Sequence, residues 1–200
     1  MLLCKDPERL TFAVIAVTFA AIRLVYTLRH RGARARLESR SAADQLLMLV
    51  IIPLGTVVIP ATWVLSTLLE FADYSRPTWV GLLGIGIMLT STLVFWRTHV
   101  ELGASFSGLL KIMDGANLVT TGLYARVRHP MYAAITFYAL GQVLLIPNWV
   151  AGPSNTIVVV FIYLIRVPKE EALLEREFGE EFDHYKANSG VFFPRLRRLS

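Results

Sequence analysis

Five long apolar blocks constrain the fold of this chain more than any other feature. They cover about 10–28, 46–69, 78–96, 130–149 and 154–167, and the last of them is short. A helix needs about 20 apolar residues to cross the hydrocarbon core of a bilayer. Hydrophobic residues make up 54% of the chain and charged residues 18%, which is too apolar for an ordinary soluble domain. The sequence therefore predicts an all-α, polytopic membrane helix bundle with about five transmembrane helices.

The segments between the blocks differ sharply in basic content. Fifteen Lys and Arg residues lie in three of them: 29–45, 97–129 and the tail from Lys169. Three lie in the others: 1–9, 70–77 and 147–153. Short loops rich in Lys and Arg mark the cytoplasmic side of a membrane protein. We therefore expect a multi-pass integral membrane protein, in the cytoplasmic membrane if the source is prokaryotic, with the first set of segments inside.

Charge and cysteine content exclude several other classes. The basic run that holds Arg29 to Arg40 suits anionic membrane lipids as partners, so the net charge of +5 does not indicate nucleic acid. Cys4 is the single cysteine, which excludes a disulfide framework and a cysteine metal site. The first block is too long for the apolar part of a signal peptide. Arg23 lies near the inner end of this block, where its side chain can reach the interface. We infer no metal site and no obligate protein partner.

The stretch VRHPMYAAI, residues 127–135, places polar side chains at the start of the fourth block. Pro130 can open a helix, because the first helical turn needs no amide donor. It also moves His129 out of the α region. Arg128, His129 and Tyr132 then stand at the mouth of the bundle. An ordinary interfacial belt of such residues is the alternative interpretation.

The C-terminal segment adds a second polar group at the same membrane edge. Pro168 is expected to kink or end the fifth span, and it is well placed to begin a new helix. The segment that follows predicts an amphipathic cytoplasmic helix, whose apolar stripe holds Leu174, Phe178, Phe182 and Tyr185. Going back along this stripe gives Glu170 and Arg166. Charges at the membrane edge indicate a functional site, unless the two residues merely pair across one turn. Segment 97–129 is long for a simple loop, and we expect an ordered cap there.

These residues carry a family resemblance. DGANLVTTGLYARVRHPMYAAI (114–135), followed by RVPKEEALLEREFGEEFDHYKANSGVFFP (166–194), resembles the isoprenylcysteine carboxyl methyltransferase family. The family is related to the phospholipid methyltransferases, and the small size looks like its short prokaryotic members. The resemblance covers about 100–194. It implies one membrane domain, 1–200, with three N-terminal transmembrane helices in 1–96 and a cofactor-binding catalytic half in 97–200.

The resemblance also implies a cofactor and a set of site residues. The cofactor is S-adenosyl-L-methionine, which leaves as S-adenosyl-L-homocysteine, bound on the cytoplasmic face. Its implied contacts are Leu109, Ala116, Asn117, Leu118, Val119, Tyr124, His129, Pro130, Met131, Tyr132 and Glu170. Arg166 is implied to bind the substrate carboxylate. Two positions depart from the family pattern: Ala116 replaces a histidine and Phe106 replaces a tryptophan.

The expected reaction is carboxyl O-methylation of an isoprenylcysteine-like lipophilic acceptor that enters from the bilayer. A carboxylate is already a nucleophile near neutral pH, so alignment in a dry pocket is the main requirement. Phospholipid or amine N-methylation and thiol S-methylation share the same cofactor half and remain alternatives. A non-enzymatic membrane interaction protein would explain the hydrophobicity but not the polar residues at the membrane edge.

Overall fold

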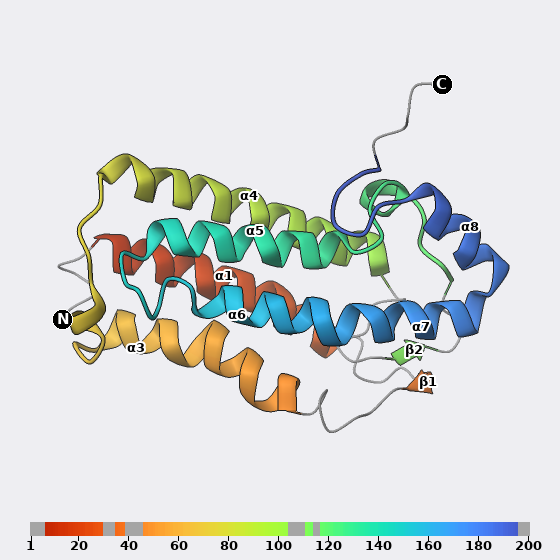
Figure 1. Cartoon of the computed structure of the whole chain (residues 1–200), viewed down its shortest axis with the longest axis horizontal. Coiled ribbons are helices and arrows are strands. Elements are labelled where there is room, and N and C mark those ends of the chain that lie inside the picture. The colour runs from red at the N-terminus through yellow and green to blue at the C-terminus, as the bar shows by residue number, and fades with distance from the viewer. Residues whose placement is uncertain (1–6, 30–34, 39–45, 104–110, 114–116, 196–200) are drawn as a thin grey trace.

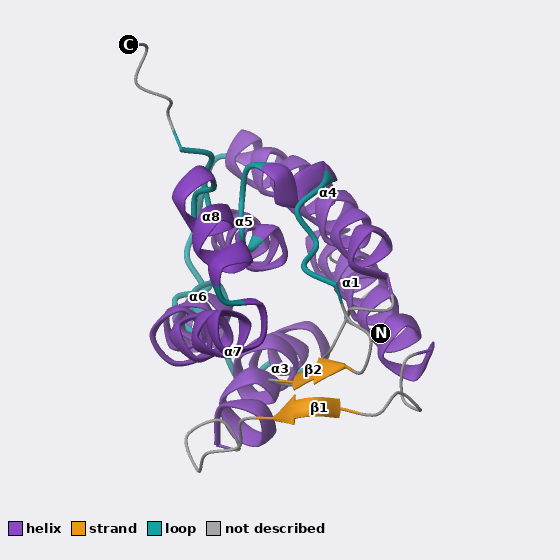
Figure 2. Ribbon diagram, turned by 90° about the vertical axis from the view of Figure 1, so that its right-hand side faces the viewer, coloured by secondary structure: helices purple, strands orange, loops and turns teal. Residues whose placement is uncertain are grey.

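The computed structural model describes residues 7–29, 35–38, 46–103, 111–113 and 117–195. Its long helices run side by side along the longest axis of the molecule (Figure 1). Seen along that axis, they surround a common interior (Figure 2). Three predicted blocks become regular helices: α1 (Pro7–Arg29), α4 (Thr78–Leu102) and α5 (Pro130–Leu145). The predicted helix bundle is therefore confirmed.

The lengths of the described helices do not confirm the predicted number of five membrane crossings. Among the described residues, α1 and α4 are the two helices that are both long enough and apolar enough to cross a membrane. Shorter apolar helices cover Leu49–Leu65 and Pro130–Leu145. Helix length alone thus supports a membrane bundle without settling the count of five.

The second apolar block folds as an irregular helix around two prolines. It contains the π-helical turns η1 (Leu47–Ile51) and η2 (Leu54–Val58) and then α3 (Ile59–Leu65). Pro53 precedes η2 and Pro60 lies in the first turn of α3. Proline removes a helical hydrogen bond and its ring crowds the preceding turn, and wider π turns accommodate such defects. Ser66 then adopts an extended conformation, so this helix ends before residue 69, the expected end. A short 3₁₀ turn, η3 (Glu70–Ala72), follows.

The C-terminal helix does not end at Pro168, so of the two expected outcomes, a kink or an end, the structure excludes the end. α6 (Ser154–Phe161) passes through a π turn, η6 (Ile162–Arg166), directly into α7 (Val167–Phe178). The amide of Val167 donates to the carbonyl of Ile162, five residues back, and this wider turn lets the chain carry the proline without ending. The break comes at Gly179, whose φ of +50° suits glycine, and α8 (Glu180–Asn188) begins there.

One short strand pair adds to the expected all-α fold. β1 (Ala35–Glu38) pairs antiparallel with β2 (Lys111–Met113). The pair joins the segment after α1 to the segment after α4, and it lies at the same end of the bundle as α7 (Figure 1). Outside this strand pair, the regular elements of the described residues are helices, as predicted. Hydropathy could not indicate the ladder, because three or four paired residues leave no periodic signal.

α4 and α5 pack closely because glycines face each other across them. A Cβ on Gly84 would lie 2.7 Å from the carbonyl oxygen of Gly141, and a Cβ on Gly141 would lie 2.6 Å from Cγ of Met88. Small residues let membrane helices approach closely in this way. Further along, the hydroxyl of Ser91 donates to the carbonyl oxygen of Ala134 at 2.5 Å. The contact therefore sets the position of α5, and with it the position of His129 and Tyr132.

The opposite end of the bundle is held by buried arginines. Arg9 donates to the carbonyl oxygen of Ser66 and lies over the ring of Trp63. Arg76 donates to Glu8 at 2.9 Å and to the carbonyl oxygen of Leu145 at 2.6 Å. These bonds tie the start of α1 to the connections before α4 and after α5. Those segments share one end of the molecule, as the charge count predicts, and the candidate site lies at the other (Figure 1).

We predict that Gly141→Ala destabilises the protein by about 1–3 kcal/mol, because the added methyl group overpacks the α4–α5 contact. Gly86→Ala on the same helix pair is the control, since a Cβ there meets nothing within 4 Å. Thermal unfolding in detergent measures the effect. Equal melting temperatures for the two variants would contradict this account of the contact.

Candidate active site

The polar residues of the site gather where α5 begins. His129 has φ −122° and ψ 59°, outside the helical region, and Pro130 occupies the first turn of α5. Both features confirm the sequence prediction for this motif. Arg128 and His129 are buried rather than spread on the surface. That burial does not fit an ordinary interfacial belt, whose side chains reach into the headgroups.

Tyr132 connects the two charged residues that the sequence predicted. Its hydroxyl donates to Oε2 of Glu170 at 2.6 Å and accepts from Nε of Arg166 at 3.1 Å. Arg166 is only 5% exposed. Glu170 follows it by one helical turn, so both side chains project toward the first turn of α5. The structure therefore brings together Arg166, Glu170 and Tyr132, and the tyrosine hydroxyl bridges the two charges.

Arg23 also lies next to these residues, a position that the sequence did not predict. Nη1 of Arg23 lies 3.7 Å from Sδ of Met131. Its side chain also interacts electrostatically with Tyr132, Arg166 and Glu170. The side chain therefore turns toward the site, and its reach to the membrane interface stays a prediction. An arginine inside an apolar span was the available signal, since such charges are costly and commonly functional.

A second acidic residue, Glu171, joins three elements. Its Oε1 accepts from Nε of Arg128 at 2.9 Å and lies 3.2 Å from Nε2 of His129. Its Oε2 lies 3.9 Å from Nζ of Lys186 on α8. The hydrogen bond to His129, with those from Arg128, lowers the pKa of Glu171 to about 2, although burial acts in the opposite direction. Glu171 therefore stays ionised and links α7 to the residues before α5.

The chain after α8 pairs with the residues before α5. The amide of Arg128 donates to the carbonyl oxygen of Gly190, and the amide of His129 donates to that of Val191. Nη1 of Arg128 adds a bond of 2.6 Å to the carbonyl oxygen of Ser189. A Cβ on Gly190 would overlap the carbonyl of Phe193, so glycine is needed there. The C-terminal segment thus forms one wall of the site.

Tyr124 is fixed from two sides. The hydroxyl of Tyr185 donates to the carbonyl oxygen of Tyr124 at 2.6 Å. Burial raises the pKa of Tyr185 to about 12 and also raises that of Tyr124, so both phenols stay protonated. The carboxylate of Glu101 accepts from the amide of Leu123 at 2.7 Å, where the short turn η5 (Gly122–Ala125) begins. The end of α4 therefore anchors this part of the predicted cap.

The structure describes only some of the remaining predicted cofactor contacts. Leu109 and Ala116 lie outside the described residues, as does Phe106. Asn117 is exposed, and Leu118 and Val119 are partly buried. The polar face of the predicted amphipathic tail helix is exposed at Glu175, Arg176, Glu180 and Asp183. These residues are divided between two helices, α7 and α8.

The fold and the site together define a class of protein, a helical membrane bundle in which Arg166, Tyr132 and Glu170 form a partly buried hydrogen-bonded group at one end. The eukaryotic intramembrane Ras methyltransferase ICMT has this fold, with a TM-score of 0.54, 21% identity, and coverage of 76% of this chain and 50% of that one. The model of the isoprenylcysteine carboxyl methyltransferase family matches residues 82–176. Residues 82–176 of this chain are therefore similar to that family.

Several curated proteins are similar to this chain. A probable protein-S-isoprenylcysteine O-methyltransferase of Oryza sativa is 28% identical over 133 residues, which is 64% of this chain and 70% of the rice protein. The Schizosaccharomyces pombe enzyme is 34% identical over 116 residues, or 56% of this chain and 47% of its own length. The human enzyme is 27% identical over 146 residues, or 71% and 51%. The chain thus spans about half the length of the yeast and human relatives.

We predict that Glu171→Gln lowers the melting temperature at pH 7 by about 5 °C, because it weakens charged hydrogen bonds worth about 1.5–3 kcal/mol. The pKa of Glu171 is depressed, so its contribution to stability is complete above the ordinary value of 4.5 and is lost as the pH falls toward 2. The difference between wild type and variant should therefore shrink below pH 4.5. Tryptophan fluorescence during heating measures it.

Glu175→Gln is the matched control, because Glu175 lies on the exposed face of the same helix. It should leave the melting temperature unchanged at every pH. A difference between wild type and Glu171→Gln that stays constant from pH 7 to pH 3 would contradict the ionic role of Glu171.

Proposed function

We propose that this chain is an integral membrane methyltransferase that uses S-adenosyl-L-methionine to esterify the carboxylate of an isoprenylcysteine-like acceptor. The family and its named relatives support carboxyl methylation. A methyltransferase requires a methyl donor, and the sulfonium cofactor is the part that goes beyond the family name. The single observation that carries the proposal is the pair of hydrogen bonds by which the hydroxyl of Tyr132 connects Arg166 to Glu170.

The residues present fit such a cofactor. Glu170 offers a partly buried carboxylate oriented by the hydroxyl of Tyr132, which suits the ammonium group of an amino acid moiety. Tyr124, His129, Pro130 and Met131 lie in the first turn of α5 and in the segment before it. We assign these residues, with 117–119, to cofactor binding. The family pattern adds Leu109 and Ala116.

Arg166 is assigned to the acceptor. Its guanidinium is permanently charged and planar, and it can hold a carboxylate through two parallel hydrogen bonds. The bond from its Nε to Tyr132 fixes its orientation, and burial excludes competing water. When bound, the cofactor supplies an electrophilic methyl group on a cationic sulfur. The protein then has to align a carboxylate oxygen with that group in a dry site, and no general base is required.

In the proposed membrane arrangement the chain is one domain with five crossings, the first three in 1–96 and the cofactor-binding half in 97–200. The site faces the cytoplasm. Support comes from the imbalance of fifteen to three in Lys and Arg between the two sets of connecting segments. The lipophilic acceptor reaches the site from the bilayer, between apolar helices.

Cysteine labelling tests the orientation. In a Cys4→Ser background, Ser75→Cys should react with a membrane-impermeant maleimide on intact cells. Arg36→Cys should react only after the membrane is permeabilised, because the basic segment is retained inside. The reverse pattern would overturn the orientation while leaving the fold unchanged.

Two variants separate cofactor binding from acceptor binding. Glu170→Gln should weaken binding of S-adenosyl-L-homocysteine roughly ten- to hundredfold, since it removes a charge-assisted hydrogen bond. Arg166→Lys should keep that affinity but lower turnover on a prenylated cysteine about a hundredfold, because the planar fork that aligns the carboxylate is lost. Calorimetry and transfer of radiolabelled methyl groups are the two measurements.

Glu175→Gln again serves as the control and should match wild type in both assays. An acceptor whose carboxylate is already esterified should remain unmodified. Methyl label in the phospholipid fraction, with an inert prenylcysteine, would replace the acceptor assignment by lipid N-methylation. Equal affinity of wild type and Glu170→Gln for the product would remove the cofactor assignment.

A further inference from the structure

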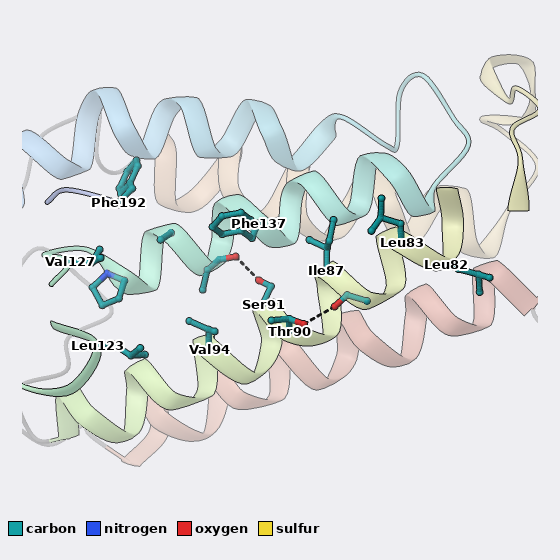
Figure 3. Close-up of a pocket in the computed structure, with 14 residues that line it drawn as sticks. Leu82, Leu83, Ile87, Thr90, Ser91, Val94, Leu123, Val127, Phe137 and Phe192 are labelled. Atoms are coloured by element: carbon teal, nitrogen blue, oxygen red, sulfur yellow. Dashed lines mark hydrogen bonds between the residues drawn. The ribbon is translucent and has the colours of Figure 1, made fainter. Parts of the chain in front are cut away.

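A long apolar groove lies along the outer seam of α4 and α5. It has a volume of about 650 Å³ and runs from Leu82 near the start of α4 to Val94 (Figure 3). Gly86, Ala133 and Ala134 leave space in the seam, while Leu83, Ile87 and Phe137 form its sides. Leu82, Leu83 and Phe137 are 62%, 50% and 42% exposed, so the groove opens outward. In the proposed membrane arrangement it therefore faces lipid.

The two hydroxyl groups in the lining have no free donor for an occupant, because each already donates to a backbone carbonyl oxygen. Thr90 donates to the carbonyl oxygen of Gly86 at 2.9 Å, and Ser91 donates to that of Ala134 (Figure 3). A helix rises about 1.5 Å per residue, so the twelve steps from Leu82 to Val94 extend about 18 Å. One leaflet of the hydrocarbon core is about 15 Å thick. The groove is thus long enough for a single extended hydrocarbon chain that starts at the inner interface and reaches slightly past the bilayer midplane.

The inner end of the groove is basic. Arg97 follows Val94 by three residues on the same face of α4, and its side chain is 61% exposed. The carboxylate of Glu101 joins Arg97 to the amide of Leu123, which itself lines the groove. Arg126 is exposed and precedes Val127, another lining residue. Two exposed guanidinium groups at the headgroup level suit a lipid phosphate.

The acceptor's own tail does not fit this groove. Pro130, Ala133, Ala134 and Phe137 place the groove on one face of α5. Tyr132 lies two residues from both Pro130 and Ala134, which is about 200° around the helix. Since Arg166 bonds to Tyr132, an acceptor carboxylate held by Arg166 lies on the other side of α5. The occupant is therefore a different molecule from the acceptor.

We propose that the groove is a binding site for an anionic phospholipid of the inner leaflet, with one acyl chain between α4 and α5 and its phosphate at Arg97 and Arg126. The site requires the proposed membrane orientation but not the methyl transfer reaction. Its inner end is formed by Leu123, Val127 and Pro130, which adjoin Tyr124, Arg128 and His129 of the candidate active site. The bound lipid therefore shares a wall with that site.

Native mass spectrometry of the full chain, released from detergent after incubation with equal amounts of phosphatidylglycerol and phosphatidylcholine, tests the proposal. Wild type should retain one phosphatidylglycerol in preference to phosphatidylcholine. Gly86→Phe should reduce retention at least about tenfold, because its side chain enters the open space of the groove. Leu89→Phe is the control, since Leu89 is exposed on α4 outside the groove, and should behave as wild type.

The headgroup is tested by charge removal. Arg97→Gln and Arg126→Gln should each reduce the preference for phosphatidylglycerol about fivefold, while phosphatidylcholine retention stays unchanged. Thermal unfolding confirms that each variant is folded. Three results would overturn the proposal: undiminished retention in Gly86→Phe, no headgroup preference in wild type, or a dimer mass that Gly86→Phe abolishes, which would make the groove a contact between two copies.

Discussion

The close contact between α4 and α5 is the interaction on which the rest of the arrangement depends. Gly84 and Gly141 let the two backbones approach near one end, and the bond from Ser91 to Ala134 holds them further along. A membrane helix pair gains little from excluding lipid, so such close packing has to supply the attraction. With α5 held in this way, the start of α5 and the end of α4 are brought to the same end of the bundle. The groove follows from the same geometry, because small residues in the seam leave the outer side unfilled.

Burial of charge explains why the candidate site is so densely connected. Arg166 and Arg128 are 5% and 9% exposed, and an isolated buried charge is costly. Both are hydrogen-bonded to other elements: Arg166 to Tyr132, and Arg128 to Glu171 and the carbonyl oxygens of Lys186 and Ser189. These partners come from α5, α7, α8 and the chain beyond. The same bonds that lower the cost of burial therefore also assemble the site.

The two consecutive glutamates, Glu170 and Glu171, have different structural tasks. Glu170 accepts from Tyr132 inside the site, next to Arg166. Glu171 binds Arg128 and His129 and holds the wall formed by the C-terminal segment. Successive residues of a helix point about 100° apart, so one pair can serve two neighbouring networks. This division supports the assignment of Glu170 to the cofactor and of Glu171 to the position of His129.

The sequence by itself determined the helical membrane class, the helix start at Pro130 and the spacing of Arg166 and Glu170 by one helical turn at the membrane edge. Those features depend on hydropathy, on the missing amide of proline and on helical spacing, which are local properties. The tertiary structure alone decided that the helix continues through Pro168, that Arg23 turns toward the site and that Glu171 joins Arg128. It also decided the strand pair and the groove. Each of these depends on which distant segments become neighbours, and no local pattern contains that information.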